Sequence, residues 1–188
     1  MSDRKLDALD IRNRFKDHQI LTDNENSGIR YIVFGTPGTS IYKINYLITK
    51  NVLCVFGDCY EAVYMWGQNV SLEFLAGCSL DYFSEKCRAS QNGAGAKNWD
   101  GIHAKKNIDF HLEDCDEMQR AHFTGNGGYA ALGNQFEWSL WLSNHGDEAF
   151  GSDWWEMCNI GMNVSFECHA HLIGLKMVQE ILTAAQAA

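Results

Sequence analysis

Proline and long hydrophobic segments are both scarce in this chain. The first shortage argues against a disordered chain, and the second argues against a membrane-spanning protein. One proline among 188 residues, together with 17 glycines, argues against a disordered or low-complexity chain. No apolar run approaches the roughly 20 residues that a membrane-spanning helix requires. The N-terminal residues 2–5 (SDRK) are mostly charged and lack the apolar segment of a secretory signal peptide. We therefore expect a soluble, cytoplasmic protein that does not bind membranes.

Paired cysteine motifs are also missing. The seven cysteines are an odd number, and no Cys-x-x-Cys pair occurs among them. In a chain without an export signal, this usage indicates free thiols in a reducing compartment, where cysteine packs as a small hydrophobic residue. The sequence therefore predicts unpaired thiols.

Lysine and arginine are almost absent from the second half of the chain. Residues 1–106 hold 13 Lys or Arg against 12 Asp or Glu, whereas residues 107–188 hold two against 12, a net charge of −10. The 55 residues between Arg120 and Lys176 contain no Lys or Arg and hold four of the six tryptophans. We interpret residues 1–188 as a single domain with a near-neutral scaffold (1–106) and an acidic, Trp-rich half (107–188).

Hydrophobic spacing predicts the fold class. Residues 29–66 alternate as three or four short strands at the spacing of an antiparallel meander. Helical spacing occupies four segments, the second of which Gly77 kinks or splits: residues 3–20, 70–88, 108–120 and 165–184. We predict an α+β fold, an antiparallel meander packed by several helices on one side.

The remaining segments are predicted as turns, connections and short elements. Residues 23–28 are rich in turn formers, and residues 90–106 are interpreted as a flexible connection. The alternation of Phe136, Trp138, Leu140 and Leu142 favours a further strand over residues 136–142. Ser152 is predicted to cap a short helix that carries the last two tryptophans.

Two groups of side chains suggest metal or acid–base chemistry. Cys168 and His171 lie three residues apart on a predicted helix and share a face, although two further ligands, such as Cys158 or His145, are needed for a zinc site. The alternative is a helix start with one packed cysteine and polar histidines. These two residues carry the alternative functional hypothesis, a small metal- or cysteine-dependent enzyme.

The second group is a histidine and carboxylate cluster. His103, Asp109 and His111 form a spacing that acid–base or metal chemistry can use, but Lys105 and Lys106 between them favour a solvated surface. No other catalytic motif accompanies it, and we expect no cofactor.

The acidic half is the main candidate for function. Its carboxylates are threaded through patterned segments, which favours a folded acidic surface that docks a basic partner, anchored by Trp154 or Trp155. The candidate partner-binding carboxylates are Asp109, Glu113, Asp114, Asp116, Glu117, Asp147, Glu148, Asp153 and Glu156. Two alternatives remain open: the charge serves solubility alone, and the tryptophans form a core. Direct nucleic-acid binding is disfavoured because phosphate contacts need clusters of Lys and Arg. A homo-oligomeric structural protein is a third hypothesis.

Three segments resemble uncharacterised small proteins carried by bacteriophages, prophages and mobile elements. They are residues 34–42 (FGTPGTSIY), 53–58 (LCVFGD) and 83–90 (FSEKCRAS). The resemblance brings no catalytic residues and implies a cytoplasmic accessory protein in a bacterial host. Acidic proteins of such elements often bind and block basic, nucleic-acid-handling host machinery, including defence complexes. We therefore expect a non-enzymatic binding protein that inhibits a basic host protein or protein–nucleic-acid complex.

Overall fold

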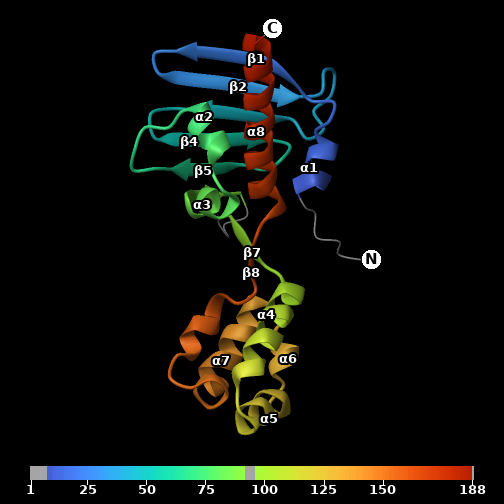
Figure 1. The fold of residues 1–188 in the computed structure, drawn as a ribbon, viewed down its shortest axis with the longest axis vertical. Coiled ribbons are helices and arrows are strands. Elements are labelled where there is room, and N and C mark those ends of the chain that lie inside the picture. The colour runs from blue at the N-terminus through green and yellow to red at the C-terminus, as the bar shows by residue number, and fades with distance from the viewer. Residues whose placement is uncertain (1–7, 92–95, 188) are drawn as a thin grey trace. The chain divides into compact units, whose positions relative to one another are not determined.

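The computed structural model describes residues 8–91 and 96–187, and the chain divides into two compact units (Figure 1). The sheet unit comprises Met1–Ala96 and Val164–Ala188, and the helical unit comprises Lys97–Asn163. Each unit encloses its own hydrophobic core. The compositional boundary at residue 106 coincides with neither junction, so the acidic half is shared between the two units. The single-domain organisation of residues 1–188 remains a prediction.

The sheet unit contains a six-stranded antiparallel meander, which confirms the predicted α+β class. Each strand pairs with its neighbour in the sequence: turns or loops join the first five strands in succession, whereas residues 66–86, which include two helices, join the fifth strand to the sixth. The strands are β1 (Gln19–Asn26), β2 (Ile29–Gly35), β3 (Ile44–Ile48), β4 (Val52–Gly57), β5 (Ala62–Met65) and β6 (Cys87–Ser90).

Helices cover one face of this sheet. They are α1 (Ala8–Arg14), α2 (Leu72–Gly77), α3 (Leu80–Glu85) and α8 (Phe166–Ala187). In Figure 1, α8 crosses in front of the strands, and α1, α2 and α3 all contact α8. Side chains buried beneath the helices alternate along β3, where Ile44, Tyr46 and Ile48 are enclosed. The terminal helix and the break after Gly77 agree with the sequence prediction.

Two predictions for the N-terminal region are wrong. The helix predicted over residues 3–20 ends at Arg14 in the described residues, and much of the predicted turn 23–28 belongs to strand β1. Pairing with β2 overrides the turn-forming composition, and Arg30 reinforces it by an ion pair of 2.7 Å to Asp23. The turn itself is confined to Ser27 and Gly28, whose φ angles of 52° and 77° fit a two-residue hairpin loop.

The helical unit is built almost entirely from short helices. A two-stranded sheet, β7 with β8, lies where the chain enters and leaves this unit. Its elements are β7 (Lys97–Trp99), α4 (Gly101–Asp114), α5 (Glu117–Gly125), α6 (Gly128–Ala131), α7 (Gln135–Phe150), the 3₁₀ helix η1 (Trp154–Asn159) and β8 (Met162–Val164). Among the described helices of either unit, none is long and apolar enough to cross a membrane.

The strand predicted over residues 136–142 is wrong, because this segment belongs to α7. Trp138, Trp141 and Leu142 follow helical spacing and are buried, whereas Phe136 and Leu140 are 78% and 55% exposed. The apparent alternation therefore mixes core residues with surface residues. The burial of one helical face decides the local structure.

The boundaries around α4 and α5 also differ from prediction. The connection predicted over residues 90–106 contains β7 and the start of α4, and the predicted helix 108–120 is interrupted after Asp114. Asp116 begins α5 through a reciprocal capping box with Gln119, which ends the continuous helix. Met118, which the helical spacing from Ile108 and Leu112 would place on a buried face of one continuous helix, is 77% exposed. The residue that precedes η1 is Asp153 instead of Ser152, and it makes no side-chain cap bond.

Candidate functional site

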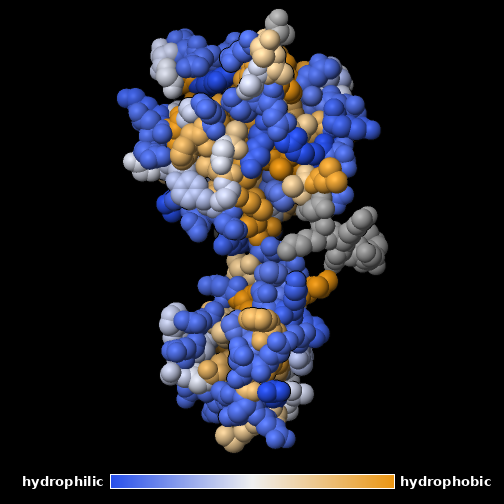
Figure 2. Space-filling model, in the orientation of Figure 1, coloured by the Kyte–Doolittle hydropathy of each residue, from blue (hydrophilic) through white to orange (hydrophobic). Residues whose placement is uncertain are grey.

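The helical unit carries most of the chain's net charge. It holds four Lys or Arg against 11 Asp or Glu, a net charge of −7 out of −9 for the whole chain. All of the candidate partner-binding residues lie in this unit, and every candidate carboxylate is exposed. The visible surface of the unit in Figure 2 is correspondingly mostly hydrophilic.

Four of the candidate carboxylates lie at the ends of two helices. Glu113 and Asp114 lie in the last turn of α4, and Asp147 and Glu148 lie in the last turn of α7. The two ends are close because the Sγ of Cys115, just after α4, lies 4.0 Å from the backbone oxygen of Ala149 in α7. We call the surface formed here the acidic corner, which comprises Glu113, Asp114, Asp116, Glu117, Asp147 and Glu148.

The acidic corner has unfavourable local electrostatics. The C-terminus of a helix carries a partial negative charge, so each carboxylate in a last turn costs about 0.3–1 kcal/mol when exposed. Four corner residues are placed in this way, and neither last turn contains Lys or Arg. Asp116 and Glu117 are different, because they lie at the favourable start of α5, where Asp116 accepts a hydrogen bond of 2.8 Å from the backbone of Gln119. Helix capping therefore accounts for the position of Asp116. The four carboxylates in the last turns of α4 and α7 stand where the helix dipole destabilises them.

Two of the four Lys and Arg residues of the helical unit bond to groups other than the corner carboxylates. Lys105 pairs with Asp109 at 2.9 Å, and Tyr129 donates a further bond of 2.8 Å to the same carboxylate. These bonds, that of Lys105 first, lower the pKa of Asp109. Arg120 donates to the backbone oxygen of Cys115 at 2.8 and 2.6 Å. Within residues 8–91 and 96–187, Asp109 is the only candidate carboxylate in an ion pair, and it is therefore the least available to a partner.

The tryptophans divide between core and surface. Trp138 and Trp141 stack at 5.4 Å inside the unit, and both indole N–H groups donate to backbone oxygens at 2.8 Å. Trp154 packs against Gly146, where an added Cβ would lie 2.9 Å from the ring. Trp155 is 60% exposed. Of the two proposed anchors, Trp155 is thus the one that a partner can reach, and the contact of Trp154 places η1 beside the last turns of α7.

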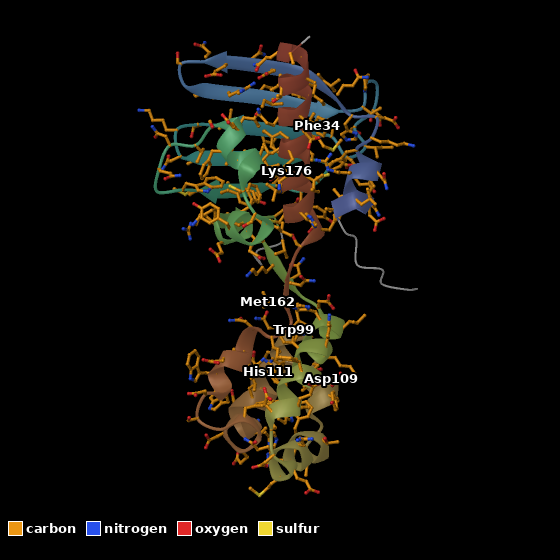
Figure 3. All side chains as sticks on the ribbon, in the orientation of Figure 1. Phe34, Trp99, Asp109, His111, Met162 and Lys176 are labelled. Carbon is orange, nitrogen blue, oxygen red and sulfur yellow. The ribbon has the colours of Figure 1, made fainter. Side chains whose placement is uncertain are left out.

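Only two of the three members of the predicted histidine and carboxylate cluster line a common pocket. His103 and His111 line a cavity of about 280 Å³ within the helical unit, together with Glu156. Asp109 does not line this cavity, and Figure 3 labels Asp109 and His111 on opposite sides of α4. Asn107 donates to the Nε2 of His103 at 3.0 Å, which holds that ring in place. The three predicted residues therefore do not form one catalytic group.

The second metal candidate is part of the core of the sheet unit. Cys168 and His171 are only 2% and 1% exposed. The Nε2 of His171 donates to the backbone oxygen of Cys59 at 2.7 Å, and its Nδ1 accepts from the hydroxyl of Tyr64 at 2.8 Å. Because a carbonyl can only accept, these partners assign the proton to Nε2. Both ring nitrogens are occupied, and burial lowers the pKa of His171 to about 4.

The cysteines provide no activated nucleophile near this histidine. Burial raises the pKa of Cys59 to about 12, so its sulfur is a thiol at neutral pH and a poor nucleophile. None of the seven cysteines forms a disulfide. No group of three or more His, Cys, Asp or Glu side chains in the described part of the chain is arranged to hold a metal ion. The proposed additional ligands Cys158 and His145 belong to the helical unit.

Sequence reasoning missed a different surface, on the sheet face opposite to the helices. We call it the open face, and its apolar members are Ile29, Tyr31, Val33, Leu47, Val52, Cys54, Phe56, Val63 and Met65. The signal was present in β2 and β4, which are apolar at almost every position, whereas a strand with one face in water alternates with polar residues.

No protein-family model matches the chain, and neither the curated proteins nor the solved structures contain a match to it.

Proposed function

We propose that this chain is a non-enzymatic binding protein whose acidic corner docks a basic surface of another protein. The observation that carries the proposal is the placement of Glu113, Asp114, Asp147 and Glu148 at the negative ends of two adjacent helices. Each of these carboxylates is repelled by the negative end of its own helix, and no described cation forms an ion pair with any of them. Lys or Arg side chains of a partner would relieve that repulsion. Exposed Trp155 supplies an apolar contact on the same unit.

The charge of the helical unit also supports the class of partner. A net charge of −7 repels nucleic-acid phosphates, so the partner is a basic protein and not the nucleic acid itself. The resemblance to proteins of phages and mobile elements favours a host protein that handles nucleic acid or acts in defence. Docking on its phosphate-binding surface would inhibit it, because the acidic corner would occupy the place of the phosphates.

The alternative, an enzyme that uses Cys168 and His171, has less support. Both side chains are buried, and the two ring nitrogens of His171 are bonded to protein groups. A catalytic or metal-binding role needs an accessible lone pair, which this arrangement does not offer.

The test compares two variants of equal net charge. The corner variant carries Glu113→Gln, Asp114→Asn, Asp147→Asn and Glu148→Gln. The control variant carries four neutral substitutions at exposed carboxylates of the sheet unit: Glu25→Gln, Glu61→Gln, Glu73→Gln and Glu85→Gln. Binding of an oligoarginine peptide is measured by calorimetry at low and high salt, followed by capture from a bacterial lysate.

We expect the corner variant to bind the peptide about 30-fold more weakly, at roughly 0.5 kcal/mol per charge, and the control to lose much less. Wild-type binding should weaken as salt increases. The corner variant should also be more stable than wild type at low salt by about 1–4 kcal/mol, because four unfavourable helix-end charges are removed. Equal losses of binding in both variants would contradict a docking site at the corner and leave only a nonspecific effect of net charge.

A further inference from the structure

The cavity of about 280 Å³ in the helical unit combines apolar walls with hydrogen-bonding groups. The described residues that line it all belong to this unit. One wall is a face of α4, where His103, Asn107 and Phe110 follow helical spacing, and η1 and β8 contribute to the other wall. Figure 3 labels one lining residue from each wall, His111 and Met162. The cavity therefore has a fixed frame of secondary structure.

Two half-buried side chains hold each other in place on the α4 wall. The Nδ2 of Asn107 donates to the Nε2 of His103 at 3.0 Å and to the backbone oxygen of Ile160 at 2.8 Å. The amide therefore uses both of its N–H groups, and its Oδ1 remains an acceptor. The bond to Nε2 assigns the proton of the neutral His103 ring to Nδ1, which remains a donor. No described residue bonds to either of these two atoms.

The buried histidines of the sheet unit differ from His103 in this respect. Both ring nitrogens of His18 bond to protein groups, at 3.1 and 3.2 Å, and so do both ring nitrogens of His171. Those two histidines serve the packing of the sheet unit. His103 and Asn107 instead keep one donor and one acceptor available beside a cavity, which is typical of a ligand site.

Phe110 adds an accessible aromatic ring to the same wall. Its side chain is 66% exposed although it lines the cavity. An aromatic ring beside free hydrogen-bonding groups is the arrangement with which proteins recognise flat heterocycles, since the ring stacks on the base and the polar groups bond to its edge. The thioethers of Met157 and Met162, from η1 and β8, also make favourable contacts with aromatic rings.

The charge and the size of the cavity narrow the class of ligand. No Lys or Arg of the described chain lines it, whereas the carboxylate of Glu156 does, and the helical unit has a net charge of −7. Phosphate and carboxylate groups are therefore repelled. The volume lies just below the usual range for ligand pockets, which suits one small ring system.

We propose that this cavity binds a nucleobase or nucleoside without a phosphate group. The edge of a base presents a donor next to an acceptor, which the Oδ1 of Asn107 and the Nδ1–H of His103 match. The ring of Phe110 stacks on the base. None of the acidic-corner residues lines the cavity, so this site does not depend on docking at the corner.

Calorimetric titration of the full chain with adenosine, guanosine, cytidine and uridine tests the proposal. At least one nucleoside should bind with a dissociation constant near 100 µM, as expected for a ligand of this size. The 5′-monophosphate of that nucleoside should bind at least about 5-fold more weakly at low salt, because its charge is repelled. Absence of saturable binding by all four nucleosides, or equal affinity for the monophosphate, would overturn the proposal.

Two exposed phenylalanines of the helical unit provide matched variants. Phe110→Ala should weaken nucleoside binding at least about 5-fold through the lost stacking. Phe136→Ala, on α7 at a residue that is 78% exposed and does not line the cavity, should bind like wild type. In NMR spectra, the side-chain amide signals of Asn107 should shift on titration, whereas those of Asn126 should not. Equal binding by the two variants, or shifts that spare Asn107, would exclude this cavity as the site.

Discussion

The buried histidine of α8 makes the stability of the sheet unit dependent on pH. His171 is neutral in the folded protein, where burial lowers its pKa to about 4, whereas an unfolded histidine titrates near 6.5. The folded-state pKa is thus depressed, so this stabilisation is complete above pH 6.5 and is lost as the pH falls towards 4. Linkage gives a loss of about 2 kcal/mol at pH 5 relative to pH 8, and of about 3 kcal/mol at pH 4.

The variant His171→Gln isolates this contribution from the other titrating groups. Glutamine does not titrate, so the variant should be less stable at pH 8 by about 1–3 kcal/mol but should lose less stability on acidification. The comparison is needed because burial also lowers the pKa of His18, which acts in the same direction in both proteins.

Urea unfolding from pH 8 to pH 5, followed by amide hydrogen exchange and mass spectrometry, measures the prediction. Peptides from β3 and α8 report the sheet unit alone, which matters because the two units need not unfold together. An NMR titration of the His171 ring provides the control. An equal pH dependence in wild type and His171→Gln, or a ring pKa near 6.5, would refute the neutral buried histidine.

Two pairs of substitutions test the packing of each unit. Gly174→Ala should destabilise the sheet unit by about 2 kcal/mol, because the added methyl collides with the hydroxyl of Tyr46, and hydrogen exchange in urea measures the loss. Gly77→Ala, at the end of α2 with nothing within 4 Å, should stabilise the same unit by about 0.5 kcal/mol. In the helical unit, Trp138→Phe should cost about 2 kcal/mol through the lost indole bond and volume, whereas Trp155→Ala should stay within about 0.5 kcal/mol in thermal unfolding. A cost at Trp155 equal to that at Trp138 would contradict its assignment to the surface.

The elements that the sequence predicts well are those whose pattern agrees with their packing. The strands between residues 29 and 66 combine β-branched or aromatic residues with tight turns, and local signals of this kind suffice for a meander. The sequence pattern does not predict strand β1, because β1 is an edge strand that is exposed over most of its length. Polar residues such as Asn24 are tolerated in such a strand, so the hydrophobic alternation is absent. The segment 136–142 was misassigned because a period of two and a helical spacing overlap over seven residues. Trp141, outside the alternation, decides in favour of the helix.

In the candidate site, too, features that depend on neighbouring residues can be predicted from the sequence, whereas features that depend on contacts between distant residues cannot. Exposure of the acidic residues follows from their chemistry, and the pair of Lys105 with Asp109 follows from helical spacing. The meeting of the ends of α4 and α7 does not follow from either, because it depends on the contact between Cys115 and Ala149. Nor does the burial of His171, whose two hydrogen-bond partners are more than 100 residues away in the chain.

The tryptophan content of the acidic half therefore contributes mainly to a core, and charge has to supply most of the proposed partner binding. Charged contacts accelerate association and set specificity more than they supply affinity, so a single acidic corner gives a weak complex.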